Sequence, residues 1–328
     1  MPLLEEEPNS ALMTSSVQLK EPKDRLGNEP KIQVYNKDVS DFFKKHAKNE
    51  SVDLIICDPP YWKVAKESWD YQWRTESDYV EWCKNWLSLI YNSLRLSGSF
   101  YLFGYLRMLV LVHEFILSLG FDFRQQIIID KGIKSVTGRA TKGYKMFPNT
   151  TESVFFYIKN AKPFIKDFLK KRAAELNLSA KEINTRLGVK INGGGVWSLY
   201  TGENILAQVP TEEMWERLSK VLEFDLEYKN IAQTFNIELG FTDVWTDINF
   251  YEEKRVHPTQ KPVSLIQRLV NASSNKGDLV CDPFSGSGST AVCCQNSKRN
   301  FIGTEVDSNY FNEIQRRLKI SKSENKLF

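Results

Sequence analysis

The sequence has few of the residues that build metal centres and disulfide frameworks. It contains three histidines, far apart in the chain, and five cysteines with no CxxC pair among them. Scarce histidine and unpaired cysteine argue against a zinc site, so we expect no metal. An odd number of scattered thiols is typical of reduced cysteines in a cytoplasmic protein rather than of a secreted disulfide scaffold.

Long apolar runs and a large excess of charge are also absent. No hydrophobic stretch approaches the ~20 residues that a membrane-spanning helix needs, so we expect no membrane association. The start of the chain is acidic, which does not fit a signal peptide. Lys+Arg 44 against Asp+Glu 41 gives a net charge of +3, so nucleic-acid binding would have to depend on local clusters of basic residues.

What remains is the composition of an ordinary globular protein of 328 residues, 41% hydrophobic and 12% aromatic. Residues 1–30 lack periodicity, and we expect a poorly ordered tail there and a short tail over 321–328. Strands and helices alternate over 31–160 and again over 247–320, which predicts an α/β fold with a parallel sheet covered by helices on both faces. Between them, short charged helices and three consecutive glycines over 161–246 are typical of a small, mainly helical insertion.

A buried strand is predicted over 52–57, and it stops at the sequence Asp-Pro-Pro-Tyr, residues 58–61. Two prolines end the strand, at the sheet edge where ligands bind in open α/β folds. They also fix the backbone, so the Asp58 carboxylate and the Pro59 carbonyl become fixed acceptors for an exocyclic amine, beside the stacking face of Tyr61. A rigid turn with a buried tyrosine is the alternative for this motif alone.

A glycine-containing turn follows a second predicted strand, over 278–281, and opens a helix. Phe284, Gly286 and Gly288 lie in this turn, where glycines let backbone N–H groups approach a ligand closely. The next strand ends at Glu305, about 20 residues downstream, the separation at which a carboxylate reaches ribose hydroxyls. The third glycine of the dinucleotide fingerprint is missing, so the pattern favours a ligand with adenosine but no phosphate. A purely structural turn is the alternative for the glycines alone.

A basic segment lies between two predicted strands. It contains no acid, and its five basic residues are expected to contact nucleic-acid phosphates, with a solvated surface loop as the alternative. These residues are Lys131, Lys134, Arg139, Lys142 and Lys145.

Three motifs in this order resemble those of the β-group S-adenosylmethionine-dependent amino-methyltransferases of DNA. They are Asp58–Tyr61, then His-Pro-Thr-Gln-Lys-Pro at His257–Pro262, and then Asp282–Gly288. The resemblance extends over both α/β segments. It implies a Rossmann-like methyltransferase sheet in circularly permuted order, with the insertion over 161–246 as a target-recognition domain.

The resemblance also implies a role for each matching position. The catalytic residues would be Asp58, Pro59, Pro60 and Tyr61. Glu305 would hold the ribose hydroxyls and Asp38 would face the adenine amine, while Thr259 and Lys261 would lie beside the methionine carboxylate. The full set of implied S-adenosylmethionine-binding residues is Asp38, Asp58, Thr259, Lys261, Asp282, Phe284, Gly286, Gly288 and Glu305.

The implied reaction is site-specific methylation of the N6 amine of adenine in DNA, with the base flipped out of the duplex. N4 of cytosine is the nearest alternative, since the chemistry is the same; aspartate rather than serine before Pro-Pro favours adenine. RNA or protein-glutamine methylation and a non-catalytic DNA-binding module stay open. Methylation at cytosine C5 is disfavoured because the chain has no Pro-Cys pair for its nucleophile. DNA is the expected partner, and a homodimer and a cognate restriction endonuclease stay open.

Overall fold

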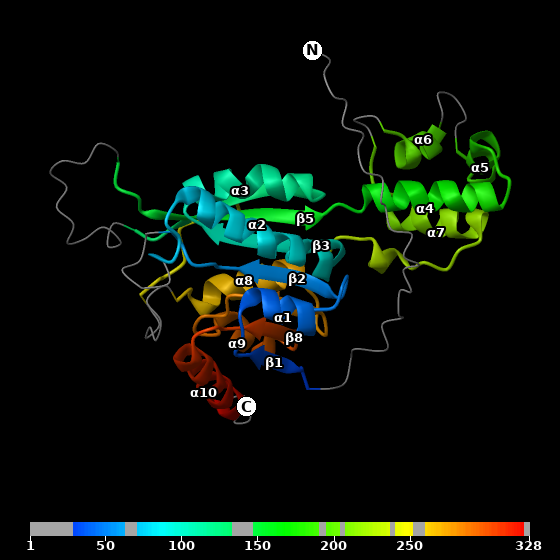
Figure 1. Ribbon diagram of the computed structural model, residues 1–328. Helices are drawn as coiled ribbons and strands as arrows, with labels where there is room; N and C mark the ends of the chain where they lie inside the picture. The colour runs from blue at the N-terminus through cyan, green and yellow to red at the C-terminus, as the bar shows by residue number, and fades with distance from the viewer. Residues whose placement is uncertain are drawn as a thin grey trace, which may run out of the picture.

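A computed structural model describes residues 29–62, 71–132, 147–189, 195–203, 207–236, 240–251 and 260–324. Within them, an eight-stranded sheet carries helices on both faces, and a group of helices projects from one end of it (Figure 1). The tail predicted over 1–30 lies outside the described residues except for its last two. The tail predicted over 321–328 is wrong at its start, because residues 321–324 continue the last helix, where Ser321 donates to Asn296.

The sheet has the strand order β1-β8-β7-β2-β3-β5-β4-β6. Its strands are β1 (Ile32–Tyr35), β2 (Val52–Cys57), β3 (Leu94–Gly104), β4 (Phe121–Asp130), β5 (Thr151–Lys159), β6 (Val244–Trp245), β7 (Leu279–Asp282) and β8 (Asn300–Thr304). Neighbours are parallel except that β5 is antiparallel to both β3 and β4. The sequence predicts a parallel sheet, and β5 is the strand that departs from this pattern. Strand β5 follows β4 in the chain, lies next to it in the sheet and pairs with it antiparallel.

Helices cover both faces of the sheet, as predicted. One layer contains α1 (Val39–His46), α2 (Glu76–Ser93) and α3 (Leu106–Ser118), and the other contains α8 (Val263–Ser273), α9 (Ser289–Asn296) and α10 (Ser308–Glu324) (Figure 1). The continuous apolar run of β2 follows from this arrangement. Ile55 and Cys57 pack under the first layer and Leu54 and Ile56 under the second, so both faces of the strand must be apolar.

Helix α2 is three residues shorter than the sequence predicts. Its start at Thr75 is fixed by a capping box with Asp78. The pattern extends the helix to 96, but it ends at Ser93, and Leu94 pairs with Val52 as the first residue of β3. The pairing with β2 therefore overrides the local helical periodicity.

A separate helical unit consists of α4 (Lys162–Glu175), α5 (Ala180–Arg186), α6 (Gly195–Thr201) and α7 (Glu212–Leu222). These helices share a core of their own, distinct from the two cores of the sheet. The unit joins the sheet at the start of β3, where Ser97 Oγ donates to the Ile231 carbonyl at 2.6 Å and Arg95 Nη1 to the Ala232 carbonyl at 3.1 Å. Because β6 pairs with β4, the unit ends before residue 244 rather than at the predicted 246.

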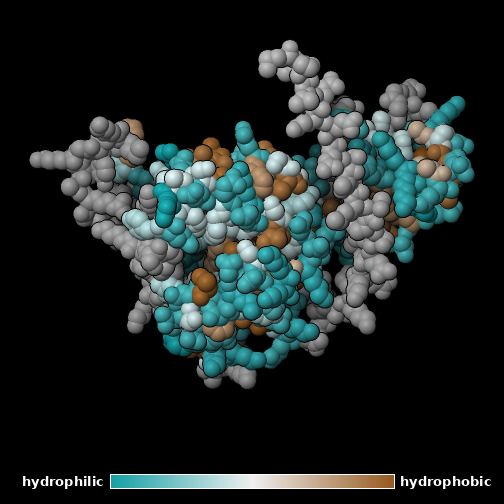
Figure 2. Space-filling view, in the orientation of Figure 1, coloured by the Kyte–Doolittle hydropathy of each residue, from teal (hydrophilic) through white to brown (hydrophobic). Residues whose placement is uncertain are grey.

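The surface is mostly hydrophilic, with apolar side chains exposed over α3 (Figure 2). Leu106, Val110 and Leu117 are 45%, 58% and 40% exposed there. The five cysteines are all buried and form no disulfide. None of the helices in the described part of the chain combines the length and the apolar character that a membrane span requires.

Candidate active site

The Asp-Pro-Pro-Tyr corner directly follows β2 at the carboxyl edge of the sheet, where the sequence places it. Strand β2 lies between β3 and β7, so the corner is supported on both sides. Helix α2 also holds it, because the Tyr79 hydroxyl donates to the Pro60 carbonyl at 3.0 Å. Pro59 is buried, whereas Asp58 and Tyr61 are half-buried. The corner is therefore a rigid turn that presents the Asp58 carboxylate from a fixed backbone.

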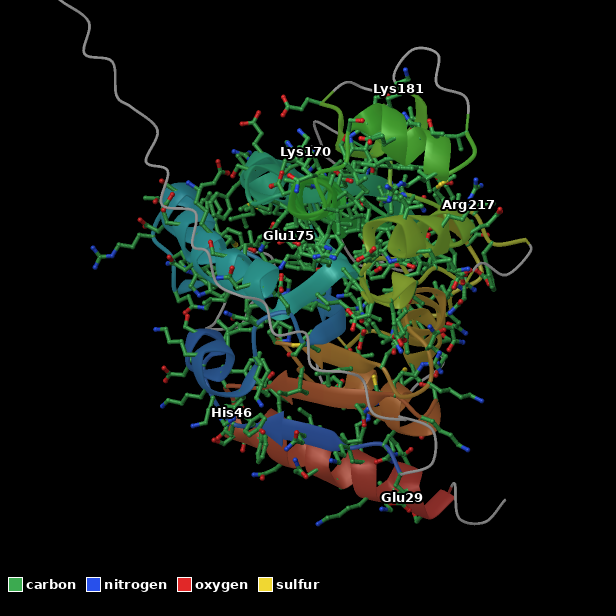
Figure 3. The ribbon with its side chains drawn as sticks, turned by 90° about the vertical axis from the view of Figure 1, so that its right-hand side faces the viewer. Glu29, His46, Lys170, Glu175, Lys181 and Arg217 are labelled. Atoms are coloured by element: carbon green, nitrogen blue, oxygen red, sulfur yellow. The ribbon has the colours of Figure 1, made fainter. Side chains whose placement is uncertain are left out.

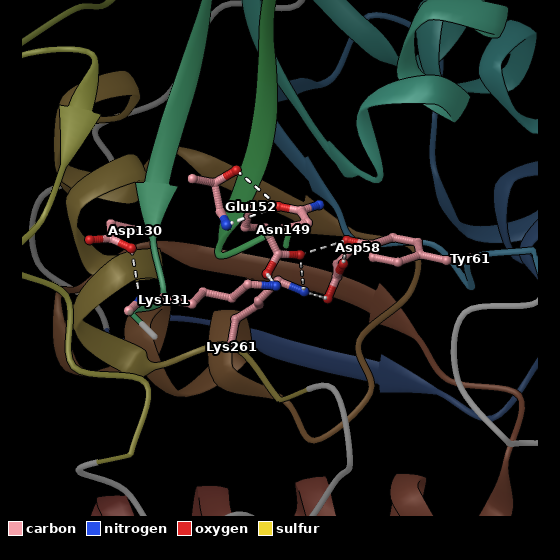
Figure 4. Close-up of polar contacts among 9 residues, drawn as sticks. Asp58, Tyr61, Asp130, Lys131, Asn149, Glu152 and Lys261 are labelled. Carbon is pink, nitrogen blue, oxygen red and sulfur yellow. Dashed lines mark hydrogen bonds and ion pairs between the residues drawn. The ribbon is translucent and has the colours of Figure 1, made fainter. Parts of the chain in front are cut away.

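Two carboxylates and two ammonium groups meet at this corner (Figure 4). Lys261 Nζ lies 2.7 Å from Asp58 Oδ2 and 3.2 Å from Glu152 Oε1. Lys131 Nζ lies 3.6 Å from the other oxygen of Glu152. The side chains of Lys261 and Glu152 are only 7% and 9% exposed. The cluster is electrically neutral when all four groups are ionised, which makes its burial tolerable.

The Tyr61 hydroxyl lies between the same two carboxylates. It is 2.7 Å from Asp58 Oδ1 and 3.0 Å from Glu152 Oε1, so it can donate to either. Lys261 Nζ is 5.6 Å from the centre of the Tyr61 ring. Each oxygen of Asp58 thus has a donor from the protein, Tyr61 on one and Lys261 on the other.

The environment shifts the pKa of the charged groups in different directions. Burial raises the pKa of Asp58, and the Lys261 ammonium offsets this only in part. Burial also acts to raise the pKa of Glu152, but Lys261 and Lys131 outweigh it and the pKa is lowered. Burial acts to lower the pKa of Lys261, but Asp58 and Glu152 reverse the shift. The pKa shifts of the two carboxylates therefore have opposite signs, upward for Asp58 and downward for Glu152.

The glycine turn between β7 and α9 contacts the acid at the end of β8, Glu305, which the sequence predicts as a ligand for ribose hydroxyls. Glu305 accepts two backbone hydrogen bonds, from Gly286 N to Oε2 and from Asp307 N to Oε1, both at 2.8 Å. Burial raises the pKa of Glu305 despite these bonds. The carboxylate is thereby held in one orientation beside the turn.

Asp282 anchors the turn from inside. Its Oδ2 accepts from Thr290 Oγ1 at 2.6 Å and its Oδ1 from Phe284 N at 3.0 Å. Burial raises the pKa of Asp282 to about 7, against the opposing effect of these two hydrogen bonds. Asp282 therefore titrates near neutral pH in the absence of a ligand.

The other residues of the turn have clear structural neighbours. The centre of the Phe284 ring lies 5.1 Å from that of Trp86 and 5.8 Å from that of Trp82, so Phe284 connects the turn to α2. Gly288 has φ of +82°, and a Cβ there would lie 2.8 Å from Ile314 of α10. Packing against α10 thus requires glycine at this position, independently of any ligand.

The remaining cofactor-binding predictions have mixed outcomes. Asp38 is exposed and caps α1, with its Oδ1 accepting from Ser40 N at 2.8 Å. Lys261, expected beside a methionine carboxylate, has its ammonium in the ion cluster, while its carbonyl accepts from Ser289 Oγ of α9 at 2.9 Å. Thr259 lies outside the described residues.

Of the five predicted phosphate-binding residues, only Lys131 lies in the described part of the chain. Its side chain is 29% exposed and its ammonium faces Glu152. Lys131 therefore neutralises a buried carboxylate in this structure instead of standing free for a phosphate. Lys134, Arg139, Lys142 and Lys145 lie outside the described residues.

Glu152 is the functional candidate that the sequence motifs do not identify. It is the second residue of β5, and because β5 is antiparallel, its amino-terminal end lies at the carboxyl edge of the parallel strands. Asp130 and Asn149 flank the same edge in Figure 4. The only signal in the sequence is a single acid directly before a buried apolar strand, Val154–Ile158.

The helical unit lies at the opposite edge from Asp58 (Figure 1). Strand β5 carries the chain from Glu152 to Lys159, roughly 23 Å at about 3.3 Å per residue, and α4 follows at Lys162. Figure 3 shows Lys170, Lys181 and Arg217 on this unit. The helical unit, for which the resemblance implies target recognition, therefore begins about one strand length away from the Asp58 corner.

Comparisons with known proteins agree with this architecture. The chain is 26% identical over 271 residues to the type II methyltransferase M1.MboII of Moraxella bovis, covering 83% of this chain and 90% of that protein. It is 26% identical over 307 residues to the DNA adenine methyltransferase YhdJ of Escherichia coli (strain K12). This alignment covers 90% of this chain and 85% of that protein. Both alignments extend over nearly the whole of each chain.

Solved structures share the fold. The M1.HpyAVI–SAM complex has a TM-score of 0.52 at 21% identity, covering 88% of this chain and 100% of that chain. The PvuII DNA methyltransferase (cytosine-N4-specific) has a TM-score of 0.53 at 16% identity, covering 89% of each chain. The DNA methylase family N6_N4_Mtase matches residues 52–316, which include both the Asp58 corner and the glycine turn, and the chain therefore belongs to this N6/N4 DNA methylase family.

Proposed function

We propose that the protein transfers a methyl group from S-adenosyl-L-methionine to the N6 amine of adenine in DNA. The observation that carries this proposal is the Asp58 carboxylate, held at the carboxyl edge of β2 on a backbone fixed by two prolines. The family relationship supports DNA as the substrate. The name of the relative YhdJ, a DNA adenine methyltransferase, supports adenine.

The acceptors of the corner suit an amine. The lone pair of an exocyclic amine is delocalised into the base, so the amine is a weak nucleophile. Hydrogen bonds from its two N–H groups to the Asp58 carboxylate and the Pro59 carbonyl would favour a pyramidal nitrogen, whose lone pair can attack. Because the amine becomes more positive as the new bond forms, these hydrogen bonds strengthen in the transition state. The base must leave the duplex to reach the corner, where Tyr61 would stack on it.

The residues of the glycine turn fit S-adenosylmethionine. Gly286 N–H and Asp307 N–H orient the Glu305 carboxylate at the end of β8, and this supports a role in holding the ribose hydroxyls. Phe284 offers an apolar surface beside Trp82 and Trp86. When bound, the cofactor supplies an electrophilic sulfonium methyl. Its presence in the M1.HpyAVI–SAM complex, a structural neighbour, supports this assignment.

N4 of cytosine presents the same pair of N–H groups to the same acceptors. The residue before Pro-Pro is an aspartate, Asp58, rather than a serine, and this favours adenine over cytosine as the target base. We also propose that the basic residues Lys134, Arg139, Lys142 and Lys145 contact phosphates close to the flipped base, because they follow β4, whose carboxyl end lies at the Glu152 edge.

Sequencing with detection of modified bases tests the proposal directly. DNA would be taken from methylation-free bacterial cells expressing the protein and from cells expressing its Asp58→Ala variant. We expect N6-methyladenine at one short sequence in the first sample only. Modification confined to cytosine N4 would overturn the adenine assignment, and no modification at all would overturn the proposed activity.

A further inference from the structure

We propose that Glu152 is a positioning residue of this site: it takes over the Tyr61 hydroxyl and the Lys261 ammonium when the target amine displaces them from Asp58. The inference rests on the proposed function, in which Asp58 accepts a hydrogen bond from the amine. It assigns a role to a residue of β5 that no motif in the sequence identifies.

The starting point is that Asp58 is already occupied. The Tyr61 hydroxyl lies 2.7 Å from its Oδ1 and Lys261 Nζ lies 2.7 Å from its Oδ2. Each oxygen of Asp58 already accepts one hydrogen bond, and Tyr61 must give up its bond to Oδ1 if its ring reorients to stack on the base. The resting site therefore holds its acceptor satisfied from within the protein.

Both donors have the same second acceptor within reach. Glu152 Oε1 lies 3.0 Å from the Tyr61 hydroxyl and 3.2 Å from Lys261 Nζ. A small movement toward Glu152 releases Asp58 without leaving either donor unpaired. This matters because Lys261 is 7% exposed, and an ammonium without a partner at that depth is strongly disfavoured.

Glu152 is suited to receive both donors because it stays ionised. Lys131, from the end of β4, lies 3.6 Å from its Oε2 and leaves Oε1 for the exchange. The pKa of Glu152 is lowered, through Lys261 and then Lys131 overcoming burial, whereas that of Asp58 is raised. The charge of Lys131 thus supports Glu152 from the side away from Asp58.

The charged and titratable groups that face Asp58 come from four places. They are Tyr61 and Cys57 on its own segment, Glu152 on β5, Lys261 before α8 and Asp282 on β7. Among the described residues, Glu152 is the one carboxylate besides Asp58 that contacts both Tyr61 and Lys261. Asp282 is instead bound to Thr290 and to the backbone of the glycine turn.

The test uses Glu152→Gln, which keeps the size and one acceptor oxygen but removes the charge. We expect kcat on DNA to fall at least about 10-fold, while cofactor affinity by calorimetry stays within about 2-fold. Removing a neighbouring negative charge must also lower the pKa of Asp58, so the acid limb of the pH–rate profile should move to lower pH. A merely structural role would lower kcat without moving this limb.

Glu50→Gln is the matched control. Glu50 Oε1 lies 3.1 Å from Nζ of Lys159, a lysine 6% exposed at the other end of β5. This change also takes a carboxylate from a buried lysine, but far from Asp58, so kcat and the acid limb should remain those of the parent protein.

A second readout does not need turnover. Carbon-13 NMR of labelled aspartate, with the Asp58 signal assigned by its disappearance in Asp58→Asn, follows the titration of Asp58 without DNA or cofactor. We expect a lower pKa in Glu152→Gln than in the parent. An unchanged Asp58 titration, or a parental kcat in Glu152→Gln, would overturn the role of Glu152. Absence of methyl transfer by the parent protein would remove the proposed function instead, and the NMR titration would still decide the coupling between Glu152 and Asp58.

Discussion

Asp58 Oδ2 and Lys261 Nζ lie 2.7 Å apart although the two residues are separated by 203 positions in the chain. The ion pair forms because Asp58 directly follows β2, which lies beside β7, and Lys261, just before α8, lies at the same edge of the sheet. It connects the proposed catalytic corner to the part of the chain that leads into the glycine turn. The ion pair holds the Asp58 carboxylate in one orientation and partly offsets the rise in its pKa that burial causes.

Asp58→Ala should abolish methyl transfer and leave cofactor binding largely intact. Its carboxylate acts chiefly on the developing charge of the amine, so kcat should fall at least about 100-fold. Lys261 keeps Glu152 as a partner, at 3.2 Å, so the variant should still fold. Single-turnover kinetics and calorimetry with S-adenosylmethionine measure the two effects. Near-parental turnover would exclude the mechanism.

Gly286→Val should weaken cofactor binding. Gly286 has φ of +50°, which a β-branched residue adopts only with strain, and its N–H orients Glu305. Gly240→Val is the matched control, because Gly240 has φ of +97° and open space around an added Cβ. Calorimetry should show affinity reduced at least about 10-fold for the first variant alone. Equal affinities in both variants would show that the turn does not bind the cofactor.

The stability of the ligand-free protein should depend on pH through Asp282. Its pKa is about 7 in the folded protein, owing mainly to burial, against about 3.9 for an unfolded aspartate. The contribution of protonated Asp282 to the free energy of unfolding is complete below about pH 4 and is lost as the pH rises through 7. Asp282→Asn should remove this part of the pH dependence between pH 5 and 8, on the order of 2 kcal/mol.

The amide of Asp282→Asn can keep both hydrogen bonds, accepting from Phe284 N and donating to Thr290 Oγ1, so the comparison isolates the charge. Urea unfolding at several pH values measures it. Identical pH dependence of the free energy of unfolding in the two proteins would contradict a raised pKa.

DNA affinity should depend on the basic segment and not on the helical unit. Lys142→Ala with Lys145→Ala should weaken binding to all sequences and flatten the slope of log affinity against log salt by about 0.9 for each phosphate that is no longer neutralised. Lys170→Ala with Lys181→Ala should leave the affinity for a duplex of about 12 base pairs unchanged. Such a duplex, centred on the Asp58 corner, extends ~20 Å to either side and does not reach the opposite edge of the sheet, where these lysines lie. Salt titrations of both double variants measure this. An unchanged slope for the first pair would move the DNA path elsewhere.

The sequence predicts the α/β fold and the positions of the two motif-bearing turns, which follow β2 and β7. The strand over 52–57 has the predicted bounds because an apolar run buried on both faces is broken by prolines. The pairing of Gly286 with Glu305 follows from their positions at the ends of neighbouring strands. The first signal lies within the strand itself, whereas Gly286 and Glu305 are 19 positions apart and meet because β7 pairs with β8.

The features that the sequence does not predict depend on pairing between distant segments. Glu152 reaches the corner only because β5 runs antiparallel, and the sequence of β5 does not specify its direction. For the same reason the helical unit, which follows β5, begins at the edge away from Asp58. Leu94 leaves the helical pattern because β2 provides a strand for it to pair with.

The identity of the atom that receives the methyl group decides whether the corner methylates adenine. DNA from a methylation-free bacterial strain would be incubated with the protein and S-adenosylmethionine carrying a deuterated methyl group, and its nucleosides analysed by mass spectrometry. We expect the label in N6-methyladenine with the parent protein and none with Asp58→Ala. Label in N4-methylcytosine or 5-methylcytosine, or equal label with Asp58→Ala, would contradict the proposed function.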